Sequence, residues 1–119
     1  MRRAQQEIAR RGWARTTEDT NALLGRTDVI LIDLREREKF GTIPGSFHVP
    51  YRDLADNLKR GGMLHELAKV TGKRLVFYCA YGERSAMAVT AVQEAGLVST
   101  FHLEGGLVAW RKVSGRITL

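Results

Sequence analysis

Short apolar runs alternate with helix-compatible segments along the chain. Val29–Ile32 and Leu75–Tyr78 are continuous apolar runs with polar neighbours, a pattern typical of strands buried in a parallel sheet. Phe47–Val49 and Ser99–Leu103 are weaker runs that predict two further short strands. Strands that alternate with helices indicate an α/β domain, with a mostly parallel central sheet flanked by helices on both faces.

The segments between these strands have the composition of helices. The best supported is Arg84–Ala95, where small alanines permit close packing on a sheet and Gly96 is a favourable residue just past the helix end. Thr16 and Thr17 are candidate N-caps of an earlier helix that ends at Gly25. Further helices are predicted at 36–40, 51–59, 63–70 and 106–114.

The first fifteen residues are expected to form an N-terminal extension, with the domain itself at 16–119. Ala4, Ile8 and Arg11 have spacings that place them on one face of a short helix over residues 2–11, which Gly12 interrupts. We interpret this segment as a marginal appended helix, and a frayed terminus is favoured over a partner-binding helix. Nothing in the chain suggests a second domain.

The composition is typical of a soluble globular protein, with 44% apolar and 27% charged residues over 119 positions. The apolar runs are much shorter than the roughly 20 residues that span a membrane. The amino terminus lacks the apolar segment of a secretory signal, so a cytoplasmic location is expected. A single cysteine excludes an internal disulfide.

The formal net charge is +6, but the basic residues are spread along the chain. No basic stripe interleaved with aromatic residues is present, which argues against nucleic-acid binding. We interpret the charge as a solvated basic surface, and the alternative interpretation is a surface that attracts small anions or an acidic partner.

The candidate chemistry centres on Cys79, the only cysteine. It follows a predicted strand and precedes a short loop and a helix, so backbone N–H groups at the helix start favour a nucleophilic thiolate there. Gly82 can adopt a positive φ in this loop. Arg84, five positions after Cys79, offers a fork of donors to an oxyanion. The alternative interpretation is a buried, inert cysteine.

The loop Cys79–Ser85 resembles the active-site loop of rhodanese domains, a family of sulfurtransferases. Two further stretches are similar to the same family: Leu31–Glu36 followed by Gly41–Pro50, and His102–Trp110. The resemblance extends over about 16–115, nearly the whole chain, and its three motifs occur in the family's order. It implies a single rhodanese-like domain.

The resemblance also implies a covalent mechanism in two half-reactions. Cys79 would take the outer sulfur of an anionic donor, such as thiosulfate, polysulfide or a protein persulfide. The resulting persulfide would pass this sulfur to a thiophilic acceptor. No metal or organic cofactor is implied. The expected partners are a small sulfur donor and a donor or acceptor protein, with the chain itself a monomer or weak homodimer and no membrane partner.

Site residues carry over from the family by position. Arg84 matches the position that binds anionic donor groups. Arg35 matches an arginine near the cysteine in some members, although it could equally form an ion pair with a carboxylate; Asp33 is expected to be structural. The loop residues expected to contact substrate are Ala80, Tyr81, Gly82, Glu83, Arg84 and Ser85.

Two features of the loop affect how strongly it is expected to attract an anionic donor. Ala80 stands where many members carry an arginine, which removes one anion contact. Tyr81 and Glu83 are expected to face solvent, although Glu83 would weaken the attraction of a dianion if it pointed inward.

Two other functions remain as alternatives. A cysteine phosphatase or arsenate reductase would place the arginine six positions after the cysteine, whereas here the spacing is five and the pocket is smaller. A persulfide carrier or partner-binding module would use Cys79 with little small-molecule turnover.

The three histidines lack partners at metal-ligand spacing. His48 and His102 fall in predicted strands, where satisfied structural histidines are expected, and His65 is isolated. Trp110 is expected to be a core residue of the last helix.

Overall fold

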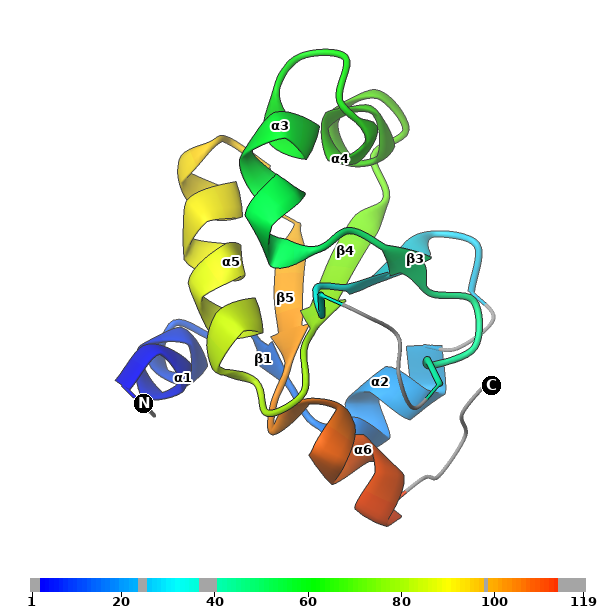
Figure 1. Cartoon of the computed structure of the whole chain (residues 1–119), viewed down its shortest axis with the longest axis vertical. Helices are drawn as coiled ribbons and strands as arrows, with labels where there is room; N and C mark the ends of the chain where they lie inside the picture. The colour runs from blue at the N-terminus through cyan, green and yellow to red at the C-terminus, as the bar shows by residue number, and fades with distance from the viewer. Residues whose placement is uncertain (1–2, 24–25, 37–40, 98, 114–119) are drawn as a thin grey trace.

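The computed structural model describes residues 3–23, 26–36, 41–97 and 99–113, and it contains a five-stranded parallel sheet between two layers of helices (Figure 1). The predicted α/β class is confirmed. Every pair of neighbouring strands is parallel, in the order β1-β5-β4-β2-β3. The strands are β1 (Ala14–Arg15), β2 (Val29–Asp33), β3 (Phe47–His48), β4 (Arg74–Tyr78) and β5 (Thr100–Leu103).

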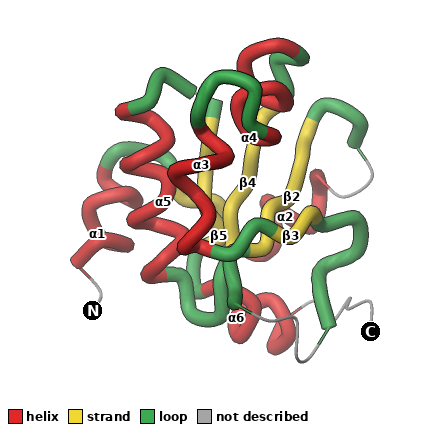
Figure 2. The backbone as a smooth tube through the Cα atoms, turned by 45° about the horizontal axis from the view of Figure 1, so that its top comes forward, coloured by secondary structure: helices red, strands yellow, loops and turns green. Residues whose placement is uncertain are grey.

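Described helices lie in the connections between β1 and β2, β3 and β4, and β4 and β5, and one further helix precedes β1 and another follows β5 (Figure 2). They are α1 (Arg3–Arg10), α2 (Thr17–Leu23), α3 (Leu54–Leu58), α4 (Met63–His65), α5 (Glu83–Glu94) and α6 (Gly106–Val113). The short helix predicted at 36–40 lies largely outside the described residues.

Two of the predicted helices change their hydrogen-bonding pattern along their length. A 3-10 turn, Tyr51–Asp53, precedes α3, and a π-helical turn, Glu66–Val70, follows α4. At the end of the π turn the Thr71 hydroxyl donates to the Leu67 carbonyl, competing with the backbone for that acceptor. Both predicted helices are present, at 51–58 and 63–70, with 3-10 or π hydrogen bonding over part of each.

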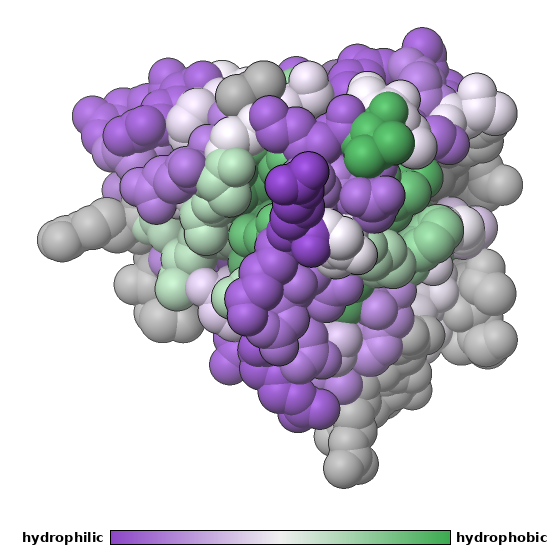
Figure 3. Space-filling view, turned by 90° about the horizontal axis from the view of Figure 1, so that it is seen from above, coloured by the Kyte–Doolittle hydropathy of each residue, from purple (hydrophilic) through white to green (hydrophobic). Residues whose placement is uncertain are grey.

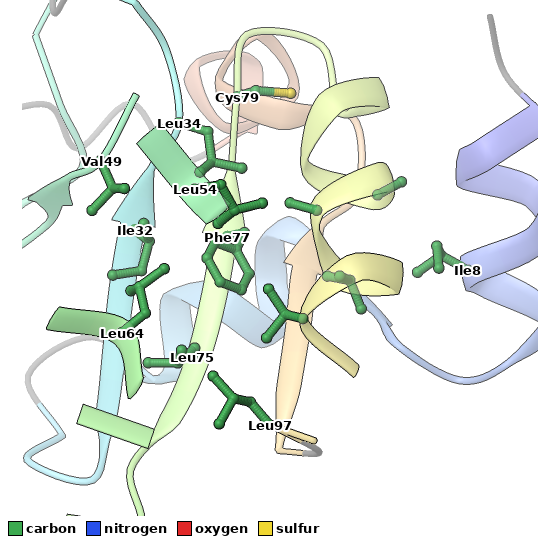
Figure 4. Packing of buried hydrophobic residues seen from close by; sticks show 14 residues of the cluster. Ile8, Ile32, Leu34, Val49, Leu54, Leu64, Leu75, Phe77, Cys79 and Leu97 are labelled. Carbon is green, nitrogen blue, oxygen red and sulfur yellow. The ribbon is translucent and has the colours of Figure 1, made fainter. Parts of the chain in front are cut away.

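Successive residues of β4 point to opposite faces of the sheet and join two separate cores. Leu75 and Phe77 pack with the layer that contains α1, α3, α4 and α5 (Figure 4). Val76 and Tyr78 pack on the other side with residues of α6 such as Trp110, which is fully buried as expected. The continuous apolar sequence of this strand thus reflects burial on both faces.

The edge strand β1 was not predicted. It comprises two residues, too few for any alternation of apolar and polar positions to be visible. Its pairing with β5 is anchored by the amides of His102 and Glu104, which donate to the carbonyls of Trp13 and Arg15. Residues ahead of position 16 therefore contribute a strand to the sheet.

Helix α1 packs against the outer side of α5, as Figure 4 shows for Ile8. The Ile8 side chain is 1% exposed. The expectation of a frayed terminus was therefore wrong for the helix itself. The alanine-rich composition of α5 keeps that helix slim enough to bury apolar residues against both the sheet and α1.

The parallel arrangement brings the ends of β2 and β4 together. Asp33 and Tyr78 are register partners, so Arg35 and Cys79 follow adjacent strands at the same edge of the sheet, as expected from the sequence. The end of the molecule at which α3 and α4 lie has a mostly hydrophilic surface with a few apolar side chains showing (Figure 3). Among the described helices, none combines the length and apolar character needed to cross a membrane.

Candidate active site

The Cys79 sulfur lies in a cradle formed by the loop between β4 and α5. Its Sγ accepts hydrogen bonds from the backbone N–H groups of Gly82, at 3.1 Å, and Ser85, at 3.4 Å. Gly82 has a φ of 102°, the conformation expected for this glycine. Figure 4 shows the sulfur directed toward the first turn of α5. These donors and the start of the helix favour negative charge on the sulfur.

The same loop is held from behind by α6. The amides of Leu107 and Val108 donate to the carbonyls of Cys79, at 2.8 Å, and Ala80, at 3.0 Å. A Cβ atom on Gly106 would lie 2.6 Å from both carbonyl oxygens, so only glycine permits this approach. Gly106, in the stretch His102–Trp110, thus allows α6 to approach the loop that carries the cysteine.

Behind the cysteine lies a buried pair of polar side chains, Ser85 and His102, each 0% exposed. The Ser85 Oγ is 3.7 Å from the Cys79 Sγ, 3.1 Å from the Gly82 carbonyl oxygen and 3.0 Å from the His102 Nδ1. The expectation of a satisfied structural histidine holds only for Nδ1, because Nε2 has no hydrogen-bond partner in the described structure. Sequence reasoning missed this pair because 17 positions separate its members.

Burial lowers the pKa of His102 to about 4, well below the ordinary value of 6.5, so the imidazole is neutral near pH 7. In the unfolded chain His102 takes up a proton near pH 6.5, whereas in the folded domain it does so only near pH 4. The unfolded state therefore binds more protons in this window, and stability falls as the pH falls through it.

We expect His102 alone to lower the free energy of unfolding by about 3 kcal/mol between pH 7.5 and pH 4. Urea denaturation at intervals across this range measures the loss. A His102→Leu variant retains the acid titration of the carboxylates but lacks this contribution, so its stability should fall less steeply. Parallel curves for the two proteins would contradict the assignment.

A pocket of about 280 Å³ opens beside the cysteine. The Arg84 side chain is exposed at its edge, with its guanidinium carbon 5.9 Å from the centre of the Tyr51 ring. Tyr81 is 71% exposed and faces solvent as expected. The pocket is lined by Leu34, Arg35, Glu36, Cys79, Ala80, Tyr81, Glu83 and Arg84.

Arg35 forms the ion pair that the sequence left as one of two possibilities. Its Nε and Nη2 donate to the two carboxylate oxygens of Asp33, with the shortest contact at 2.7 Å, and Nη2 also donates to the Gly41 carbonyl. The Asp33 side chain is 0% exposed, and it also accepts the backbone N–H of Arg35 at 3.0 Å. Arg35 thus closes one wall of the pocket while compensating a buried carboxylate.

Glu83 does not face solvent, contrary to expectation. Its Oε2 accepts a hydrogen bond of 3.3 Å from the backbone N–H of Ala4, in the first turn of α1. Next to it, the Gln5 side chain accepts the Gly105 amide at 3.3 Å. A carboxylate at a helix N-terminus is favoured by the helix dipole. The N-terminal helix therefore contacts the loop that carries the cysteine.

This loop and its surrounding motifs identify the class of protein: the chain belongs to the rhodanese-like domain family, which it matches over residues 16–113. The matched region includes Cys79, Arg84 and both flanking motifs.

Among individual relatives, the chain is 32% identical over 104 residues to a thiosulfate:glutathione sulfurtransferase of Saccharomyces cerevisiae, covering 78% of this chain and 73% of that protein. It is 34% identical over 86 residues to an uncharacterised Synechocystis protein, covering 71% of this chain but only 44% of that one. A solved Rhodopseudomonas palustris structure, described as of unknown function and a possible tyrosine phosphatase, has 36% identity and a TM-score of 0.83, covering 97% of this chain and 91% of that one.

Proposed function

We propose that this domain is a sulfurtransferase that carries sulfane sulfur as a persulfide on Cys79. The main supporting observation is the cradle, in which the Gly82 and Ser85 amides face a sulfur at the base of an open pocket. A thiolate stabilised by fixed donors is the nucleophile that sulfur transfer needs. The similarity to the yeast sulfurtransferase supports the same chemistry.

The first half-reaction begins with attack of the Cys79 thiolate on the outer sulfur of an anionic donor. With thiosulfate, a new sulfur–sulfur bond forms on Cys79, the donor's sulfur–sulfur bond breaks, and sulfite leaves with the electron pair. In the second half-reaction an acceptor thiolate attacks the outer sulfur of the persulfide. The acceptor becomes a persulfide and Cys79 returns to the thiolate.

The residues of the pocket have distinct proposed roles in this reaction. The amides of Gly82 and Ser85 preorganise the site for negative charge on sulfur, and remain in place throughout the cycle. Arg84 is exposed at the pocket edge, where its guanidinium can meet the anionic head group of a donor. Ala80 and Tyr81 line the pocket beside Arg84. Arg35 lines another part of it, where its ion pair with Asp33 keeps the side chain in position.

We expect Cys79 to gain the mass of one sulfur atom when the reduced protein is treated with a competent donor. Intact-mass measurement and peptide mapping with thiosulfate, polysulfide and a loaded cysteine desulfurase would detect the adduct and locate it. Addition of glutathione or cyanide should then remove it. Protein alkylated beforehand with iodoacetamide is the control. Failure of all three donors to form the adduct would reject the proposal.

A cysteine phosphatase is the second candidate, because the R. palustris structure with 36% identity is described as a possible tyrosine phosphatase. The five-position spacing from Cys79 to Arg84 argues against it, since it makes a smaller loop for a tetrahedral phosphate. Hydrolysis of an aryl phosphate at a rate comparable to sulfur transfer would favour the phosphatase. A persulfide that forms on Cys79 but turns over only with one protein acceptor would instead identify a carrier.

A further inference from the structure

We propose that Ser85 and His102 form a hydrogen-bonded relay that directs the Ser85 hydroxyl proton toward the Cys79 sulfur. In this relay Ser85 contacts the sulfur, and His102 is a positioning residue that acts through the serine. The inference rests on the proposed function only in taking Cys79 as the nucleophile.

The Ser85 hydroxyl has one proton and three polar neighbours. Its Oγ lies 3.1 Å from the Gly82 carbonyl oxygen, 3.0 Å from the His102 Nδ1 and 3.7 Å from the Cys79 Sγ. The last distance is long for oxygen but within hydrogen-bond range for sulfur. Which neighbour receives the proton therefore depends on whether His102 Nδ1 donates or accepts.

The surroundings of His102 favour a proton on Nδ1. Its other ring nitrogen, Nε2, is buried without a hydrogen-bond partner among the described residues. A proton on Nε2 would be a buried donor with no acceptor, whereas a proton on Nδ1 has the Ser85 oxygen 3.0 Å away. With Nδ1 as donor, the serine cannot give its proton to the histidine.

The Ser85 proton then has two acceptors, the Gly82 carbonyl and the sulfur. When Cys79 is a thiol, the carbonyl is the better acceptor, and the thiol can itself donate to the serine. When Cys79 is a thiolate, rotation of the hydroxyl gives the sulfur a charge-assisted hydrogen bond besides the two backbone amides. The relay thus responds to the charge of the sulfur without moving the backbone.

His102 does not act as a general base in this arrangement. Burial lowers its pKa to about 4, and its ring contacts Ser85 rather than the sulfur. The neutral ring carries a single proton, which the surroundings described above favour on Nδ1. The ionisable groups that face Cys79 from the pocket side are Arg35, Glu36, Tyr81, Glu83 and Arg84, and all five remain in the variants used below.

The test is the pH dependence of Cys79 alkylation by iodoacetamide, which requires no sulfur transfer. Ser85→Ala should move the midpoint of the pH–rate profile up by about one pH unit, because the thiolate loses one charge-assisted hydrogen bond. His102→Leu should produce a smaller upward shift. His102→Asn places an amide N–H near the position of Nδ1 and should restore most of the wild-type profile.

Two controls separate this role from packing. Ser46→Ala removes another serine that bonds two neighbours, Tyr78 and Ile43, on the opposite face of the sheet, and should leave the profile unchanged. In a Ser85→Ala background, His102→Leu should add no further shift. Nitrogen-15 NMR of the ring should show the proton on Nδ1.

The proposal is overturned if folded Ser85→Ala alkylates with the wild-type midpoint, or if the ring proton resides on Nε2. Equal shifts for His102→Asn and His102→Leu would also overturn the role of His102. Should His102→Leu fail to fold, the NMR measurement on the wild type still decides the tautomer. Absence of sulfur transfer alongside the expected alkylation shifts would reject the proposed function while leaving the relay intact.

Discussion

Replacement of Cys79 by serine is expected to reduce sulfur transfer by about a thousandfold or more while the domain remains folded. A serine hydroxyl stays protonated at neutral pH and is a poor nucleophile toward sulfur, so no persulfide can form. The fold should tolerate the change, because the new hydroxyl is similar in size and can bond Ser85. We expect a stability loss of about 1 kcal/mol.

Thiosulfate turnover with cyanide or glutathione, followed beside intact mass and thermal unfolding, checks this expectation. The thiol-alkylated protein provides an independent comparison, since it blocks the same atom without changing the sequence. Turnover by a well-folded serine variant at more than a few per cent of the wild-type rate would show that another group carries the sulfur.

Replacement of Arg35 by alanine is expected to lower the free energy of unfolding by about 3 kcal/mol. The reason is that Asp33, fully buried, would lose the guanidinium that contacts both of its carboxylate oxygens. The lost bond to Gly41 adds to the effect, because it joins the pocket wall to the next segment of chain. Urea denaturation at pH 7.5 measures the change.

Arg52→Ala is the matched control. Arg52 also pairs with a carboxylate, that of Glu36, but its side chain is 70% exposed and the pair should contribute less than about 1 kcal/mol. If the two arginine variants were equally stable, the ion pair of Arg35 with Asp33 would not stabilise the wall of the pocket. A folded Arg35→Ala protein with wild-type stability and poor donor use would instead assign Arg35 to substrate binding.

The central part of the fold could be predicted from the sequence because its signals are local. Apolar runs of four residues each predicted β2 and β4, and the parallel pairing of these strands placed their carboxyl ends at one edge of the sheet. Gly82 and its positive φ followed from the need for a tight loop after Cys79. The apolar runs and the loop glycine depend on neighbours within a few positions, and the parallel pairing follows from the alternation of strands with helices along the chain.

The parts that escaped prediction depend on residues far apart in the chain. The contact between Ala4 and Glu83 spans 79 positions, and nothing near Glu83 distinguishes a helix-capping carboxylate from a solvated one. The bond between Ser85 and His102 depends on how α5 lies over β5. The sequence could not decide whether Arg35 binds substrate or forms an ion pair, because a neighbouring carboxylate such as Asp33 is compatible with both roles.

The contacts of α1 affect the choice of chain boundaries in protein engineering. The family match begins at residue 16, and a chain shortened to that position would lose the amide that meets Glu83 and the side chain that meets Gly105. A reporter or affinity tag joined ahead of α1 would lie close to the loop that carries Cys79, because α1 contacts that loop. Because α1 contacts this loop from outside the pocket, substitutions in α1 can change the position of the loop while every residue that lines the pocket is kept.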